Sequence, residues 1–324
     1  MINISLLFIS VMTLFLYMVP GFALKKTGLA GEGFAKALSV YVLYIAQGAM
    51  FIHGFLVRFD PAVFEGIVKV FILAFVAHLL FYLIARGLFT KAPEKLRRVL
   101  RFAVIFSNAG YMGIPVINDV FGDEFTIYAS VYVVWFNIFA FSLGRLIYTD
   151  DRKYISAKKM FINPAVLPIL FGMLLYLTGA GGWIQSVLGK DGFVPSLITM
   201  LYNVITVLKG TVAPLSMAVI GAKLADVKLG AAFKDRYLYR FLAVRLIAFP
   251  VMMWGIMRIL VAFGILNGDL TAVVLILCST PAAALTTMFA ELHDCDAAYS
   301  GKLVAVSTLV SIATMPAVAL LLKI

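Results

Sequence analysis

Long apolar runs follow one another along the whole chain, and short clusters of charged residues, Gly or Pro separate them. A helix needs about 20 apolar residues to cross the hydrocarbon of a bilayer, and most of these runs are that long. The pattern predicts an all-α integral membrane protein with ten spans, at residues 3–24, 34–56, 64–88, 99–120, 125–148, 161–180, 195–222, 238–263, 270–290 and 298–322. The fourth and ninth spans differ from the rest because helix breakers interrupt them.

Composition agrees with this pattern. Hydrophobic residues make up 63% of the chain and charged residues only 13%, whereas a soluble domain carries about 25% charged residues. The net charge of +11 does not indicate a nucleic-acid partner, because the basic residues lie in short connections between apolar runs. We expect the lipid bilayer to surround the protein and no nucleic acid to bind it.

The basic residues predict an orientation, since cytoplasmic loops of membrane proteins collect Lys and Arg. They gather near the connections after spans 1, 3, 5 and 7, for example Lys91, Lys95, Arg97 and Arg98 after span 3. Connections on the other side are poor in them. Both termini are therefore predicted outside the cytoplasm, in the cell (inner) membrane. The connection after span 9, ELHDCD, departs from the rule because it has no Lys or Arg.

Ten spans divide into two sets of five, and an odd number per repeat gives the halves opposite orientations. We predict a first repeat at 1–148, a cytoplasmic linker at 149–160 and a second, inverted repeat at 161–324. A shift of 172 residues lays FSNAGYMGIPVINDVFGDEF, in span 4, on CSTPAAALTTMFAELHDCDA, in span 9. Both copies run from small polar residues and a breaker to an acidic turn.

These two interrupted spans carry the candidate site. Pro lacks an N–H and clashes with the preceding turn, so Pro115, with Gly110 and Gly113, should unwind the middle of span 4, and Pro281 should unwind span 9. Unwound backbone is tolerated at membrane depth where it lines a cavity, and half-helix N-termini there attract anions. Isolated breakers also kink membrane helices without forming a site, but matching breaks in two repeats favour one. The candidate residues are Ser107, Asn108, Gly110, Gly113, Pro115, Ser279, Thr280 and Pro281.

The same residues carry a family resemblance. Asn108-Ala-Gly-Tyr-Met-Gly-Ile-Pro115 resembles the Asn…Met-Gly-Ile-Pro signature in the fourth helix of the auxin efflux carrier family. STPAAALTTMFAE resembles that family's proline-broken ninth helix, and STLVSIATMP, from Ser307 to Pro316, resembles its last helix. The short central connection, TDDRKYISAKK, is similar to that of the compact prokaryotic members.

The resemblance implies a fold and a function. Bacterial members are commonly called malate or malonate permeases, so it implies transport of small organic anions without a cofactor. It also implies that broken helices 4 and 9 cross. Helices 1, 2, 6 and 7 would form a scaffold, helices 3–5 and 8–10 a moving transport domain, and two copies a homodimer.

Some polar residues lie outside the two breaks. Gln47 is expected to line the site, because span 2 faces the crossover in this architecture. Lys209, in span 7, either attracts a substrate carboxylate or extends to the membrane interface. Arg245 and Lys302 lie near span ends and are expected to reach the interface in the same way.

Three functions remain open. The first is a secondary transporter that moves an organic anion by alternating access. The second is a sodium-coupled carrier of the bile acid type, which shares the broken-helix plan. The third is a receptor or regulator on a transporter scaffold. An enzyme is not expected, because the three His are scattered and the chain has no HExxH, GxSxG or Walker pattern; no metal site is expected either.

Overall fold

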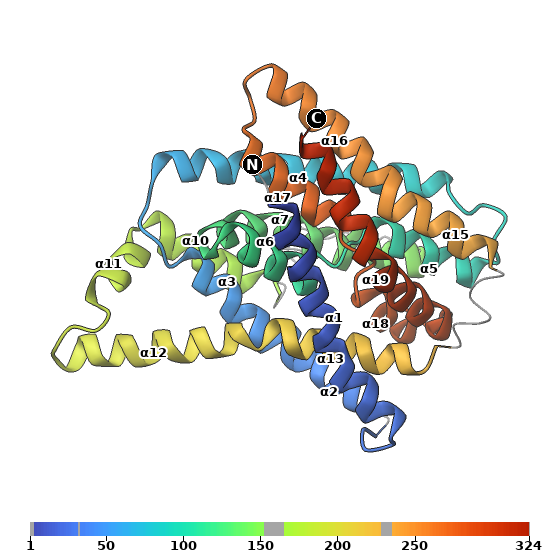
Figure 1. The fold of residues 1–324 in the computed structure, drawn as a ribbon, viewed down its shortest axis with the longest axis horizontal. Coiled ribbons are helices and arrows are strands. Elements are labelled where there is room, and N and C mark those ends of the chain that lie inside the picture. Colours follow the sequence, from blue (N-terminus) through green and yellow to red (C-terminus); the bar gives the residue numbers. More distant parts are fainter. Residues whose placement is uncertain (1–2, 32, 152–164, 228–234, 324) are drawn as a thin grey trace.

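The computed structural model describes residues 3–31, 33–151, 165–227 and 235–323, and its regular elements are helices (Figure 1). Seven helical segments are long and apolar enough to cross a membrane, or eight if a pair bent by 79° counts as one span. The chain is an all-helical protein with several membrane spans. Ten crossings stay a prediction. The predicted linker at 149–160 lies outside the described residues from 152 onward.

Four of the long spans come from the first half of the chain. Short segments labelled η belong to two of them and do not break their course: η1 and η4 are π-helical turns, and η3 is a 3-10 turn. The segments are α1 (Ile4–Lys26), α2–η1–α3 (Phe34–Tyr41, Val42–Ala46 and Gln47–Phe55), α4 (Pro61–Gly87), and η3–α7–η4–α8 (Asp123–Phe125, Thr126–Phe139, Ala140–Gly144 and Arg145–Thr149).

The second half supplies three more long spans and the bent pair. The pair bends at Gly179, whose φ of +75° suits a residue without a side chain. The segments are the bent pair α10 (Leu167–Leu177) and α11 (Ala180–Val187), then α12–α13 (Phe193–Gly210 and Val212–Ala225), α15–η6–α16 (Arg236–Ala243, Val244–Ala248 and Phe249–Ala262), and α19–η7 (Ala297–Ala319 and Leu320–Lys323).

The two predicted spans with helix breakers are not continuous helices. The fourth consists of α5 (Glu94–Ile105), η2 (Ala109–Gly113) and α6 (Ile114–Phe121), and the ninth consists of α17 (Gly268–Ser279) and α18 (Leu285–Leu292). Twelve helical residues extend about 18 Å, so no single piece crosses a bilayer alone. The interruption of both spans is as the sequence predicts.

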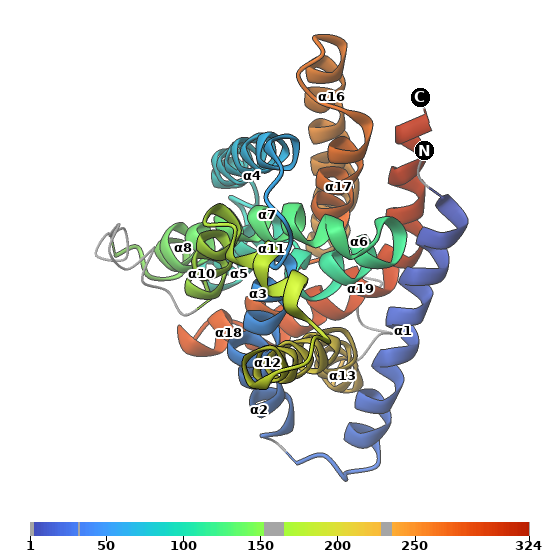
Figure 2. The same ribbon diagram turned by 90° about the vertical axis from the view of Figure 1, so that its left-hand side faces the viewer.

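Close helix contacts depend on glycine, as is usual where the hydrophobic effect cannot drive helices together. α1 lies across α13, and a Cβ at Gly21 or Gly221 would collide with the opposite backbone. The broken helix α17 occupies the interior and is buried on every face from Leu270 to Ser279. In two perpendicular views α7 lies near the centre, with α12 and α13 along one edge and α4 and α16 along the opposite edge (Figures 1 and 2).

Candidate functional site

The interruption in span 9 begins where its proline predicts. The residue before a proline avoids helical backbone angles, and Thr280, with φ −63° and ψ 152°, leaves the helix immediately after Ser279. The next helix begins at Leu285. The hydroxyls of Ser279 and Thr280 donate to the carbonyls of Ile276 and Leu277, at 2.8 and 2.9 Å. Both hydroxyls therefore bind carbonyls of the last turn of α17.

The interruption in span 4 lies earlier than Pro115 predicts. α5 ends at Ile105, and the non-helical residues are 106–108. Pro115 is in the first turn of α6, where a missing N–H costs little. The π-helical turn η2, which is wider than an α-helical turn, comes directly before it. The span is interrupted near its middle, as expected, but the non-helical residues precede Gly110, Gly113 and Pro115.

The two interruptions pair with each other although they are far apart in the chain. Asn108 N donates to the carbonyl of Pro281 at 2.7 Å, and Ala283 N donates to the carbonyl of Phe106 at 2.9 Å. An antiparallel bridge joins Ser107 and Ala282 between them. Unpaired backbone groups cost several kcal/mol each at membrane depth. Each broken helix therefore satisfies part of the backbone that the other exposes.

Gly113 permits close packing beside this crossing. A Cβ at Gly113 would lie 2.7 Å from Leu277 Cδ2 on α17, which is closer than packed carbon atoms approach. The absence of a side chain thus lets η2 lie against the end of α17.

Arg245 is the residue on which sequence reasoning fails most clearly. It is fully buried in η6 rather than extended to the interface. Its Nη1 donates to the carbonyls of Val104, at 3.0 Å, and Ile105, at 3.3 Å. Its Nε donates to the carbonyl of Thr280 at 3.3 Å, and its Nη2 donates to that of Cys278. One guanidinium therefore binds the C-terminal carbonyls of both α5 and α17, where a cation is favoured by both helix dipoles.

Lys302 is also misplaced by the sequence argument. Its Nζ lies 2.6 Å from Asp235 Oδ2, and both side chains are largely buried. A specific ion pair replaces the expected extension to the interface.

A cavity of about 50 Å³ lies beside the paired interruptions. That volume holds about four water molecules. Four of the predicted site residues line it, namely Gln47, Ser107, Asn108 and Gly110. Asn137, on α7, also lines it. The other lining residues include Ser39, Leu43, Tyr111, Phe136, Ala283, Ala284, Leu285 and Met288.

Two side-chain amides, those of Asn108 and Gln47, lie at this cavity. Asn108 is 3% exposed, and its Nδ2 has no hydrogen-bond partner among the described residues. A buried donor without a partner costs about 1–3 kcal/mol unless something binds it. Gln47 lies so close to Gly110 that a Cβ there would collide with its Nε2. The glycine therefore lets the Gln47 amide lie against η2.

Two half-helices begin at the cavity. η2 follows Asn108, and α18 begins at Leu285 after Ala284, and all three of these residues line the cavity. The first N–H groups of a helix lack partners in the helix and carry about half a positive charge. No charged side chain is among the cavity's lining residues. Positive potential there comes from the backbone, which suits an anionic group.

Comparison with known proteins identifies the family. A family model described as "Membrane transport protein" matches residues 6–319, nearly the whole chain. The chain belongs to the auxin efflux carrier family. A protein of Methanothermobacter thermautotrophicus described as an "Uncharacterized transporter" is 26% identical over 319 residues, which cover 95% of each chain. The family resemblance found in the sequence is confirmed, and this is a family of transporters rather than of enzymes.

A larger vestibule adjoins the cavity in this carrier. Its volume is about 550 Å³, and it shares Ser39, Ala284 and Met288 with the cavity lining. Its charged lining residues are three basic and one acidic, namely Lys36, Arg145, Lys223 and Glu291. The vestibule next to the two half-helix N-termini therefore carries net positive charge.

Lys209 does not line the cavity of the carrier. Its Nζ lies 2.6 Å from Asp123 Oδ2, just after α6, and 3.5 Å from His53 Nδ1. Lys223, on the same long span, lies 2.9 Å from Glu291 Oε1 near the end of α18. The α12–α13 span therefore carries two ion pairs, each to the far end of the second half of a broken helix.

Proposed function

We propose that this protein is a secondary transporter of small organic anions, such as the mono- or dicarboxylates malate and malonate. The observation that carries the proposal is the convergence of two half-helix N-termini and the unpartnered Asn108 amide on one cavity. Amide donors and helix N-termini recognise carboxylates without needing a buried charge. The cavity has room for one carboxylate group, and the rest of a dicarboxylate would extend into the vestibule.

Alternating access would move the crossover past a fixed scaffold. In this proposal the scaffold comprises spans 1, 2, 6 and 7, and the transport domain spans 3–5 and 8–10, in two inverted repeats of five. Helix packing supports the division: α1 packs on α13, α3 packs on both α10 and α12, and α4 packs on α7. The ion pairs of Lys209 and Lys223 join the proposed scaffold to the proposed transport domain at both ends of the crossover.

The vestibule would face the cytoplasm. Its Lys36, Arg145 and Lys223 belong to the connections that are rich in basic residues, and such connections are retained inside. Both termini would then lie outside the cytoplasm in the cell (inner) membrane. A homodimer, as the family resemblance implies, belongs to the same proposal.

Ligand-dependent stabilisation of the purified protein tests the proposed site. A ligand at about 100 times its Kd stabilises the folded state by about 2.7 kcal/mol. We expect malate, malonate or a related carboxylate to raise the Tm, and Asn108→Ala to abolish that rise. Asn203→Ala, on the exposed surface of α12, is the matched control and should keep it. Stabilisation of Asn108→Ala equal to that of the control would reject the site.

The alternatives give different results in flux assays. A sodium-coupled carrier of the bile acid type would lose flux when choline replaces sodium, whereas proton coupling or uniport would not. A receptor or regulator would show ligand-dependent stabilisation and no flux for the same ligand.

A further inference from the structure

A second cavity lies apart from the crossover, between the ends of α4, α5 and α8. Its volume is about 540 Å³, and it shares no lining residue with the crossover cavity or the vestibule. Its lining includes four arginines and one acidic residue: Arg86, Arg97, Arg98, Arg101 and Asp150. Apolar lining residues come from three helices, namely Tyr82, Ala85, Ile105, Leu143, Leu146 and Ile147.

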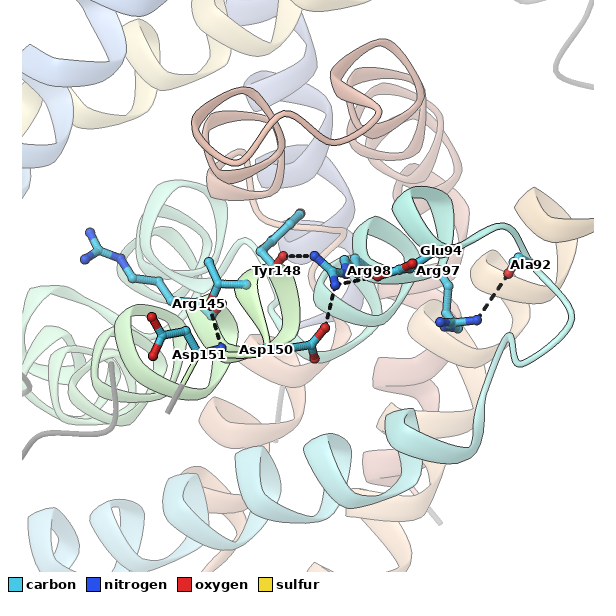
Figure 3. A network of polar contacts seen from close by, with 9 residues as sticks. Ala92, Glu94, Arg97, Arg98, Arg145, Tyr148, Asp150 and Asp151 are labelled. Atoms are coloured by element: carbon cyan, nitrogen blue, oxygen red, sulfur yellow. Dashed lines mark hydrogen bonds and ion pairs between the residues drawn. The ribbon is translucent and has the colours of Figure 1, made fainter. Parts of the chain in front are cut away.

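Arg98 pairs with two acidic side chains near this cavity, those of Glu94 and Asp150. Its Nη2 lies 2.5 Å from Glu94 Oε1 and also contacts Asp150, and its Nη1 donates to the carbonyl of Tyr148 (Figure 3). These contacts join the first turns of α5 to the end of α8. Both nearby carboxylates thus pair with this arginine.

The other three arginines have no acidic partner among the described residues. Arg97 donates only to the carbonyl of Ala92, at 3.5 Å. Arg101 donates to the carbonyls of Leu88 and Arg86. The side chain of Arg86 is exposed and makes no hydrogen bond or ion pair with the described residues. Three guanidinium groups facing one cavity repel one another, and a bound anion would relieve that repulsion.

The position of the cavity suits an amphipathic anion. Arg86 is in the last turn of α4, a span with mean hydropathy 2.5. Leu79 and Leu83 precede Arg86 by seven and three residues and so share its helix face. Leu83 is 50% exposed. A phospholipid would contact both features, with its phosphate at the basic groups and its acyl chain along the apolar helix face. A free anion would contact only the basic groups.

We propose that this cavity binds the headgroup of an anionic phospholipid, with its phosphate at Arg86, Arg97 and Arg101. The connection after span 3 is among the basic ones, so the site would face the anionic lipids of the cytoplasmic leaflet. The acyl chain lies along Leu79 and Leu83. The cavity also contains Ile105, the last residue of α5, so the lipid anchors the half-helix that leads into the crossover.

Native mass spectrometry of the delipidated protein in detergent tests this site by titration with phosphatidylglycerol, cardiolipin or phosphatidylcholine. We expect the two anionic lipids to bind and phosphatidylcholine to bind much more weakly. Arg86→Gln with Arg97→Gln should lower phosphatidylglycerol affinity about thirtyfold, or about fivefold per arginine. Arg240→Gln removes an exposed charge from α15 and should change affinity less than about twofold.

Arg86→Gln alone should fold normally, because its side chain makes no hydrogen bond or ion pair with the described residues, and it should still lose affinity about fivefold. Inorganic phosphate and glycerol phosphate, added at matched concentration, should not displace the lipid. Equal affinity in the double variant and in Arg240→Gln would overturn the proposal. Displacement by inorganic phosphate would overturn it as well, by assigning the site to a free anion.

Discussion

Replacing Arg245 tests how the two interrupted helices are held together. Its guanidinium donates to four carbonyls, two at the end of α5 and two at the end of α17. Arg245→Met keeps most of the side-chain volume but removes every donor and the charge. The four carbonyls then lose their buried partner in a region where water is scarce.

The size of the effect follows from these contacts. An unsatisfied buried polar group costs about 1–3 kcal/mol. The variant also no longer has to bury a charged guanidinium, so the net loss of stability is smaller than four times that value. Removing one partner from a buried charged network costs about 3–5 kcal/mol in measured cases. At about 2 °C per kcal/mol for a large domain, we expect Arg245→Met to lower the Tm by about 6–10 °C. Arg245→Lys keeps a charge and three donors and should lose about half as much.

Thermal unfolding in detergent measures this effect, and Arg240→Met is the matched control. Arg240 is exposed on α15, one turn before η6, so the same substitution there should change the Tm by about 1 °C or less. A Tm for Arg245→Met within about 2 °C of the parent would refute the reasoning. Equal losses in the two variants would refute it too, because the loss would then not depend on the four carbonyls.

Three further predictions concern the cavity, the vestibule and pH. Gly110→Ala should push the Gln47 amide out of place and weaken carboxylate stabilisation at least tenfold, whereas Gly255→Ala, with no atom within 4 Å of its added Cβ, should leave it unchanged; equal ligand titrations would contradict this. Lys223→Gln removes the ion pair to Glu291 at the vestibule. It should make α18 more accessible to protease and change the Tm little, since such exposed pairs contribute about 1 kcal/mol or less. Burial and the charges of Arg145 and Arg98 lower the pKa of His293 in the folded state. Its contribution to stability is therefore present above about pH 6.5, the pKa of a free His, and is lost as the pH falls below that value. His293→Gln should flatten the fall in Tm between pH 7.5 and 5.5, and parallel curves for the variant and the parent would contradict the assignment.

The sequence predicts the long apolar segments and the interruption at Pro281 well, because both depend on local chemistry. Apolar length sets a span, and Pro281 fixes the residue at which α17 ends. Pro115 misleads because a proline is tolerated in a first helical turn, and the first interruption is set instead by pairing with residues near Ala282. That partner is more than 170 positions away, and no local pattern identifies it.

The sequence predicts only those candidate-site residues that a local pattern marks. Asn108 and Gly110 lie at the start of η2 and follow directly from the breaker motif. Arg245 could not be placed from the sequence, because its four partners are backbone carbonyls. Every residue has such a carbonyl, so residue types do not mark these partners. A basic residue within an apolar span with no acidic partner nearby was the available signal.

Uptake of labelled malate and malonate into proteoliposomes most directly tests the claim that the paired interruptions form an anion transport site. The account predicts saturable uptake of at least one of these carboxylates by the parent protein. Asn108→Ala should reduce that uptake at least tenfold while keeping the parental Tm within about 3 °C, and Asn203→Ala should transport at the parental rate. Parental uptake by Asn108→Ala, or no uptake of any small carboxylate by the parent protein, would contradict the account.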